Sequence, residues 1–182
     1  MEFRGRSSNK IRFQQDSRKQ IPNQTSPETN KNNQEKGLEF EKFVVQRFDQ
    51  DYFTLVEWRS DKNVGGIFPL MSKFPDLEFY YESKTDFFQF AVECKWREHF
   101  YRDCVEIDKY QIENYQHYEK VTGYRTFLVI GIGNVPISPM HLYIIPLSEI
   151  KNNKMHEFEM EVYRRKNPLE SFFLDCKHQR LI

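Results

Sequence analysis

Two short acidic motifs near the middle of the 182-residue chain are the strongest candidates for chemistry. Pro75-Asp76 precedes a run of aromatic residues, and Glu93-Cys94-Lys95 follows a short distance later. Two carboxylates that meet in a protein need a cation beside them or a shifted pKa. Lys95 supplies one positive charge, and a divalent metal ion would supply the rest. These residue types therefore predict a site for a hard cation held by carboxylate oxygens.

The residues around the second motif alternate in a way that predicts a half-buried strand. From Phe88 to Trp96 every second residue is apolar, and Glu93 and Lys95 both fall on the other face. An earlier strand is predicted at about 77–81, joined to this one by the polar turn 82–86. A hairpin through that turn would carry Asp76 back towards Glu93.

A third acid lies on an upstream helix, which the sequence predicts over 37–50. Leu38, Val45 and Phe48 follow a helical apolar stripe, and Glu41 falls within it. A carboxylate in an apolar stripe needs a partner or a metal ion. The alternative is a glutamate at the edge of the helix that reaches water or pairs with a lysine.

A second helix is predicted from Asp108 to Thr122, with Asp108 as the N-cap and Gly123 just beyond its end. Gln111 and Tyr115 are four residues apart, so they share one face of this helix. They are candidates for the site, and the alternative is a buried Tyr115 beside a solvated Gln111.

The remaining segments predict an α/β fold. Apolar runs indicate three further strands, at 53–59, 126–132 and 142–145. Between the first of these and the central hairpin lies a polar loop, 60–72, whose Asp61 could approach the site. Residues 99–106 read as irregular. Strands that alternate with helices favour an α/β sandwich with a mixed sheet.

The composition adds limits on domain organisation and location. The whole chain has 27 basic and 27 acidic residues, so its net charge indicates no partner. Residues 1–36 carry eight basic and four acidic residues, which predicts a disordered basic tail or a basic arm for nucleic acid, followed by one domain at 37–182. Three cysteines without a CxxC pair predict reduced thiols and a cytoplasmic protein. No apolar run is long enough for a membrane span.

Taken together, these motifs resemble those of the PD-(D/E)xK nuclease superfamily. The resemblance covers about residues 37–150 and runs through four features in order: the helix residues from Gly37 to Glu41, Pro75-Asp76, the ExK of Glu93 to Lys95, and a QxxxY pair, Gln111 and Tyr115, like that of RecB-like nucleases. It implies a restriction-endonuclease-like fold, an α/β/α sandwich with a central mixed β-sheet.

The resemblance also implies a chemistry, the metal-dependent hydrolysis of phosphodiester bonds. Mg²⁺ would be the cofactor, with Mn²⁺ as a substitute. Its implied ligands are Asp76, Glu93, Glu41 and the backbone carbonyl of Cys94. Lys95 would orient the attacking water or stabilise developing negative charge. Gln111 and Tyr115 would orient Lys95, a ligand or the nucleic-acid backbone.

Two other functions fit the same fold. One is a catalytically silent nucleic-acid-binding or assembly module, and the intact Asp76, Glu93 and Lys95 argue against it. The other is a structure-selective nuclease of the junction-resolvase type.

For the substrate we expect DNA in preference to RNA. A homodimer or a partner protein is expected to supply any specificity, because the chain has no separate recognition domain. Endo- or exonuclease action, and one metal ion or two, stay open.

Overall fold

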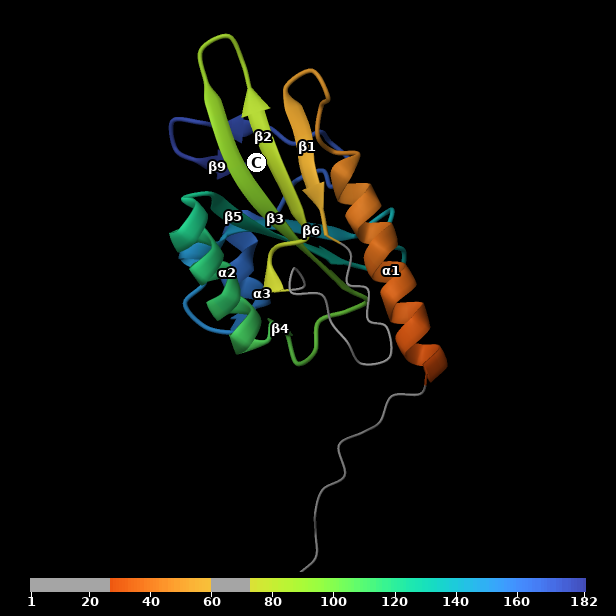
Figure 1. Cartoon of the computed structure of the whole chain (residues 1–182). Coiled ribbons are helices and arrows are strands. Elements are labelled where there is room, and N and C mark those ends of the chain that lie inside the picture. Colours follow the sequence, from red (N-terminus) through yellow and green to blue (C-terminus); the bar gives the residue numbers. More distant parts are fainter. Residues whose placement is uncertain (1–26, 60–72) are drawn as a thin grey trace, which may run out of the picture.

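The computed structural model describes residues 27–59 and 73–182, with side chains from residue 32 onward, and its centre is a five-stranded mixed sheet. The strand order is β1-β2-β3-β5-β6 (Figure 1). The strands are β1 (Phe53–Trp58), β2 (Leu77–Glu82), β3 (Phe87–Arg97), β5 (Arg125–Ile132) and β6 (His141–Pro146). β3 and β5 pair in parallel and the other neighbours are antiparallel. The predicted α/β class with a mixed sheet is confirmed.

The β2–β3 hairpin forms as the alternating pattern predicts. Leu77 pairs with Val92 and Phe79 with Phe90, and all four of these side chains are at most 2% exposed. The Ser83 N–H donates to the carbonyl of Asp86 (2.8 Å) and closes the turn. This register brings the start of β2 next to the end of β3, so Asp76 lies beside the Glu93-Cys94-Lys95 motif.

Helix α1 (Pro27–Val45) is longer and differently placed than the sequence pattern predicts. It begins ten residues before position 37, and it ends at Val45 rather than at 50. Its buried side chains are Phe40, Phe43 and Val44, whereas Leu38 is 39% exposed. The predicted apolar stripe was therefore wrong at Leu38, whereas Val45 and Phe48 do pack against the core as partly buried residues. The most deeply buried face of the helix is the neighbouring set, Phe40, Phe43 and Val44. Residues 27–36, expected to belong to a disordered tail, form the first half of this helix.

Helices pack on both faces of the sheet (Figure 1). On one face, α1 and the C-terminal hairpin of β8 (Leu174–Asp175) and β9 (Arg180–Leu181) share a cluster with the apolar side of β3. On the other face, α2 (Lys109–Thr122) shares a second cluster with β5 and β6. β5 and β6 thus contribute buried side chains to both apolar layers.

The ends of α2 lie where the sequence predicts. Asp108 accepts a hydrogen bond from the Tyr110 N–H (2.7 Å), which satisfies a free donor of the first turn. At the other end Gly123 has φ of 75°, and its N–H donates to the Glu119 carbonyl (2.8 Å). Glycine adopts this left-handed conformation without a Cβ clash, so the prediction of both caps is confirmed.

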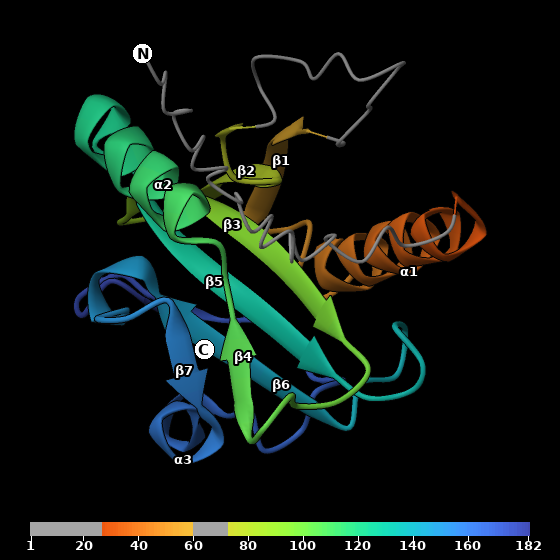
Figure 2. The ribbon, with the colours of Figure 1, turned by 90° about the horizontal axis from the view of Figure 1, so that it is seen from below.

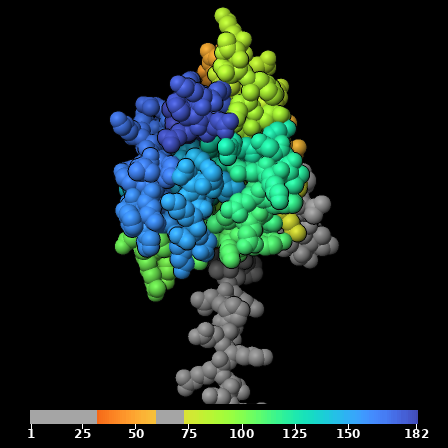
Figure 3. Space-filling model, turned by 90° about the vertical axis from the view of Figure 1, so that its left-hand side faces the viewer, coloured from red at the N-terminus to blue at the C-terminus, as the bar shows by residue number. Residues whose placement is uncertain are grey.

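One further strand occupies the segment that the sequence marked as irregular. β4 (Cys104–Glu106) pairs with β7 (Lys154–His156), and the short helices η2 (Leu147–Glu149), α3 (Glu157–Met160) and η3 (Glu161–Tyr163) lie before and after β7. β4 was missed because three residues are too few to show a period. Figure 3 shows this C-terminal part packed beside α2, with the β2–β3 turn projecting at one end.

The contact between α1 and the sheet is unusually close at one point. A Cβ added at Gly131 of β5 would lie 2.3 Å from the ring of Phe40. Only glycine lets the helix approach the strand this closely. The α1 residues that follow Phe40 are thereby held against the end of β3 (Figure 2).

Within residues 27–59 and 73–182, no helix has both the length and the apolar character needed to cross a lipid bilayer. Asp61 and the 60–72 loop lie outside the described residues.

Candidate active site

A cleft of about 1370 Å³ lies between the first half of α1 and the end of β3. Its lining includes four predicted site residues from three segments: Glu41, Asp76, Cys94 and Lys95. Trp58 and the chain from Trp96 to His99 complete much of the wall, together with Tyr101. A small-molecule pocket is usually about 300–1000 Å³, so the cleft has room for a larger ligand.

Asp76 and the ExK motif are in direct contact. One carboxylate oxygen of Asp76 accepts a hydrogen bond from the Cys94 N–H (2.8 Å). Lys95 Nζ lies 2.5 Å from Glu93 Oε1, with both side chains largely buried. The second oxygen of Glu93 is buried and has no hydrogen-bond partner among the described residues. Glu93 does not line the cleft itself, because its side chain is only 3% exposed.

Burial and neighbouring charges shift the pKa values of Asp76 and Lys95 in this cluster. Burial raises the pKa of Asp76 well above its usual range, and the charge of Glu93 raises it further, against the opposing effect of Lys95. Burial lowers the pKa of Lys95, but the charges of Glu93 and Asp76 outweigh burial and leave it above the usual value. Lys95 therefore stays protonated, whereas Asp76 holds its proton more tightly than a solvent-exposed aspartate does.

The thiol of Cys94 has a different character. Burial, followed by the charge of Asp76, raises its pKa well above the usual value, so the sulfur remains a protonated thiol. A protonated thiol is a poor nucleophile and a poor metal ligand. The contribution of Cys94 to the cluster is its backbone, whose N–H holds Asp76.

Glu41 reaches the cleft from α1, at the edge of the buried face of the helix. Its carboxylate accepts a hydrogen bond from the indole N–H of Trp58 (2.6 Å). Its charge also contributes to the raised pKa of Asp76, so the two acids are electrostatically coupled. The structure thus places Glu41 on the wall of the same cleft as Asp76, with one oxygen accepting from Trp58.

A buried ion pair beside the cluster was not found by sequence reasoning. Arg59 Nη2 lies 2.6 Å from Glu78 Oε2, which also accepts from the Tyr118 hydroxyl (2.8 Å). Arg59 further donates through its backbone N–H to the Asp76 carbonyl (2.7 Å) and through Nη1 to the Pro75 carbonyl (3.1 Å). Arg59 therefore holds the backbone of the acidic motif. Local pattern gave no signal for it, because its partners are distant in sequence.

The QxxxY pair lies on the same face as Glu93 and Lys95 but outside the cleft lining. Tyr115 is 2% exposed and packs in the cluster with Leu128, which pairs with Glu93 in the sheet. Gln111 lies one turn earlier and is partly exposed. Their predicted role in orienting Lys95 or the ligand remains a prediction.

Asp76 and Glu93 offer carboxylate oxygens, the kind of donor that Mg²⁺ binds. Among residues 27–59 and 73–182, no three His, Cys, Asp or Glu side chains are grouped so that they could hold a metal. Mg²⁺ commonly binds through one or two carboxylates and keeps several waters. Asp76 and the unpartnered oxygen of Glu93 match that requirement.

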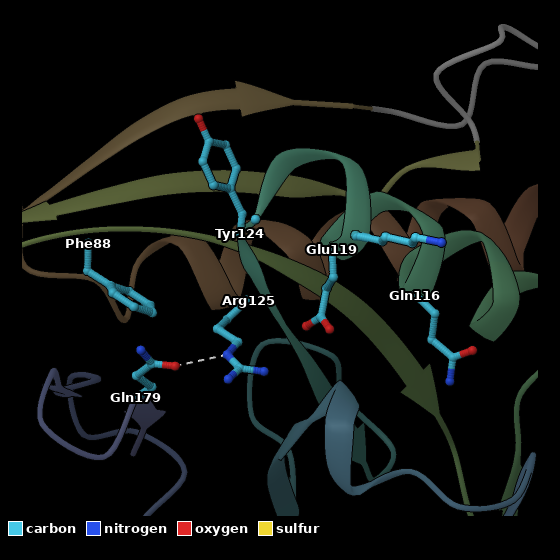
Figure 4. Close-up of a pocket in the computed structure, with 8 residues that line it drawn as sticks. Phe88, Gln116, Glu119, Tyr124, Arg125 and Gln179 are labelled. Atoms are coloured by element: carbon cyan, nitrogen blue, oxygen red, sulfur yellow. Dashed lines mark hydrogen bonds between the residues drawn. The ribbon is translucent and has the colours of Figure 1, made fainter.

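A second hollow of about 440 Å³ lies at the other end of the sheet, near the starts of β3 and β5 (Figure 4). Arg125 donates to the side chain of Gln179 there (2.9 Å). Glu119 also lines this hollow, and its carboxylate accepts a hydrogen bond from the Thr126 N–H (2.6 Å), which fixes the start of β5. These contacts indicate a structural role.

Comparison with solved structures finds chains of similar structure. A Holliday junction resolvase, Hjc, from the archaeal hyperthermophile Archaeoglobus fulgidus overlaps 69% of this chain and 93% of its own, with 12% sequence identity and a TM-score of 0.49. A similarity at this level carries no argument about function. No family model and no curated protein matches the sequence.

Proposed function

We propose that this chain is a metal-dependent nuclease, with DNA preferred to RNA, built on a restriction-endonuclease-like α/β/α sandwich. The observation that carries the proposal is the contact of Asp76 with the Glu93-Cys94-Lys95 strand at the wall of a large cleft. The order and spacing of these residues resemble the PD-(D/E)xK nucleases.

Each residue has a role that follows from its position. Asp76 and Glu93 would hold the ion, Glu41 would reach it through water, and the Cys94 carbonyl would complete the implied set. Bound Mg²⁺ would lower the pKa of water and neutralise charge on the scissile phosphate. Lys95, which stays protonated beside Glu93, would orient the attacking water or stabilise the developing negative charge.

Two supporting contacts keep this set in place. The Trp58 indole holds one oxygen of Glu41, and Arg59 holds the Pro75-Asp76 backbone. Positioning of this kind matters because a displacement of about 1 Å can cost about 100-fold in rate. Gln111 and Tyr115 would support Lys95 from the α2 side.

The test is hydrolysis of a substrate panel with Mg²⁺ or Mn²⁺: linear, branched and single-stranded DNA, and RNA. We expect Asp76→Asn to abolish cleavage, and Lys95→Gln to lower the rate by about 10²–10³-fold, the usual cost of one electrostatic contact in a transition state. Matched controls are Asp86→Asn and Lys84→Gln, which change exposed residues in the β2–β3 turn.

The same variants separate the alternatives. If neither ion supports cleavage of any substrate, while wild type and both site variants bind nucleic acid equally well, the chain is a silent binding module. Preference for branched DNA over linear duplex, from a chain that elutes as a dimer, would indicate a structure-selective nuclease.

A further inference from the structure

The chain after β3 makes a tight two-residue turn at the mouth of the cleft. The N–H of Tyr101 donates to the Cys104 carbonyl (3.1 Å), and the N–H of Cys104 donates back to the Tyr101 carbonyl (3.2 Å). The two residues between them, Arg102 and Asp103, have φ of 52° and 56°. Positive φ at both central residues is the backbone of a type I′ turn, which favours Asn and Gly.

This conformation is unfavourable for both residues, because each carries a Cβ. Backbone strain of this kind persists only where its surroundings enforce it, and it concentrates at ligand-binding positions. The surroundings here are firm. The Cys104 thiol donates to the Tyr101 carbonyl (3.0 Å), the Glu157 N–H donates to the Asp103 carbonyl (3.0 Å), and β4 pairs with β7 just beyond the turn.

The turn places the side chain of Arg102 over the aromatic ring of Tyr101. Tyr101 is 66% exposed and lines the cleft, and the Arg102 guanidinium lies 5.2 Å from the centre of its ring. The hydrogen-bonded turn holds this exposed ring at the cleft.

The basic residues of the cleft wall are Lys36, Lys95 and Arg97. Lys36 pairs with Glu98, and Lys95 pairs with Glu93, so Arg97 is the basic residue of this wall that forms no ion pair with an acid among the described residues. The wall also carries acids: Glu35, Glu41, Asp76 and Glu98.

An aromatic ring beside cationic groups is the means by which proteins bind unpaired nucleic acid. The ring stacks on a base, and the cations follow the phosphates. Inside an intact duplex both faces of each base are already stacked on neighbours, so Tyr101 could stack only on a base that is unpaired or displaced.

We therefore propose that the Tyr101-Arg102 turn is a base-stacking contact, and that the cleft takes nucleic acid with an unpaired stretch beside the scissile phosphate. This inference rests on the proposed nuclease function, since it names the substrate class of that site. Arg102 covers one side of the ring, and the incoming base stacks on the exposed side.

The test is binding in EDTA, so that no cleavage occurs. The probes are a fully paired DNA duplex and the same duplex with a single-stranded overhang that carries one 2-aminopurine, whose fluorescence falls on stacking. We expect wild type to bind the overhang substrate more tightly and to quench its fluorescence. Tyr101→Ala should weaken overhang binding by about 5- to 150-fold, the value of one stacked base, and restore the fluorescence, whereas duplex binding changes little.

Three further variants make the test specific. Tyr101→Phe keeps the ring and should bind as wild type does. Phe87→Ala removes an aromatic of similar exposure (60%) at the far end of β3 and should have no effect. The double variant Arg102→Asn with Asp103→Gly gives the turn its preferred residues. It should raise the melting temperature and still weaken overhang binding, which separates folding from recognition.

The proposal is overturned if Tyr101→Ala leaves overhang affinity and quenching unchanged, or if it weakens duplex and overhang binding by the same factor. The nuclease proposal fails separately, if Asp76→Asn and wild type cleave equally or not at all. A chain that stacks bases through Tyr101 without cleavage would keep this inference and lose the enzymatic one.

Discussion

The carboxylate of Asp76 accepts the backbone N–H of Cys94 at 2.8 Å. This hydrogen bond joins the first residue before β2 to the middle of the ExK motif on β3, so it fixes one acid of the candidate site against the strand that carries the other acid and the lysine. The same contact leaves Asp76 buried beside Glu93, which is an unfavourable place for a negative charge. The site therefore lowers the free energy of unfolding of the metal-free protein, and a bound cation would offset this loss.

Asp76→Asn should stabilise the metal-free protein at neutral pH. Because burial and Glu93 raise the pKa of Asp76, the folded state holds this proton more tightly than the unfolded state does. The charge penalty is therefore absent below the usual Asp pKa of about 3.9 and appears as the pH rises through the raised pKa. At pH 7–8 in EDTA the variant should melt several degrees higher, since 1 kcal/mol corresponds to about 2–4 °C at this size.

The measurement is thermal unfolding of wild type and variant from pH 4 to pH 8. The gap between their melting temperatures should close towards pH 4, and added Mg²⁺ should reduce it at pH 8 by stabilising wild type alone. Asp86→Asn, at an exposed turn position, is the control. A variant that melts lower than wild type at pH 8 would contradict the prediction.

Arg59 and Glu78 should behave as a coupled pair. Their side chains are only 9% and 14% exposed, so Arg59→Met leaves a buried carboxylate without its cation and should cost about 3–5 kcal/mol in the free energy of unfolding. Arg59→Met with Glu78→Leu should recover most of that loss. Urea unfolding of both single variants and the double variant gives the coupling energy, and additive effects would show that the pair is not a unit.

Gly131→Ala should loosen the attachment of α1 to the sheet. The new Cβ would lie 2.3 Å from the Phe40 ring, so the ring or the helix must move. Overpacking of this kind lowers the free energy of unfolding by about 1–3 kcal/mol. Phe40→Leu in the same chain makes room and should restore part of the stability. Gly37→Ala is the matched control, because nothing lies within 4 Å of a Cβ there. Urea unfolding measures all four proteins, and equal stability of the two alanine variants would refute the close contact.

The two residues of the QxxxY pair should respond differently to substitution. Tyr115→Ala removes a ring that is 2% exposed in the α2 cluster and should cost about 3–5 kcal/mol of stability. Gln111→Ala changes a partly exposed side chain and should leave the free energy of unfolding within about 0.5 kcal/mol. If Gln111 supports the site as proposed, its variant lowers the rate of cleavage while the thermal unfolding curve stays unchanged.

Local patterns were sufficient for the central hairpin and for α2. Alternation along β3 assigns Glu93 and Lys95 to one face, and the turn length returns Asp76 to their side, because a strand has a strict period of two. The caps of α2 were equally local, since Asp108 and Gly123 satisfy backbone groups within a few residues. These features depend on residues that are close in sequence, so they can be predicted without the rest of the fold.

The other half of the site depends on contacts between distant segments. The sequence identified Glu41 but not the most deeply buried face of α1, because the rotation of the helix is set by how Phe40 packs against Gly131, more than ninety residues away. No local sequence pattern predicts the hydrogen bond from Trp58 to Glu41 or the hydrogen bonds from Arg59 to the backbone of Pro75 and Asp76. Residue types and spacing thus specified the acids and the lysine, whereas packing between α1, β1 and the hairpin specified how they face one cleft.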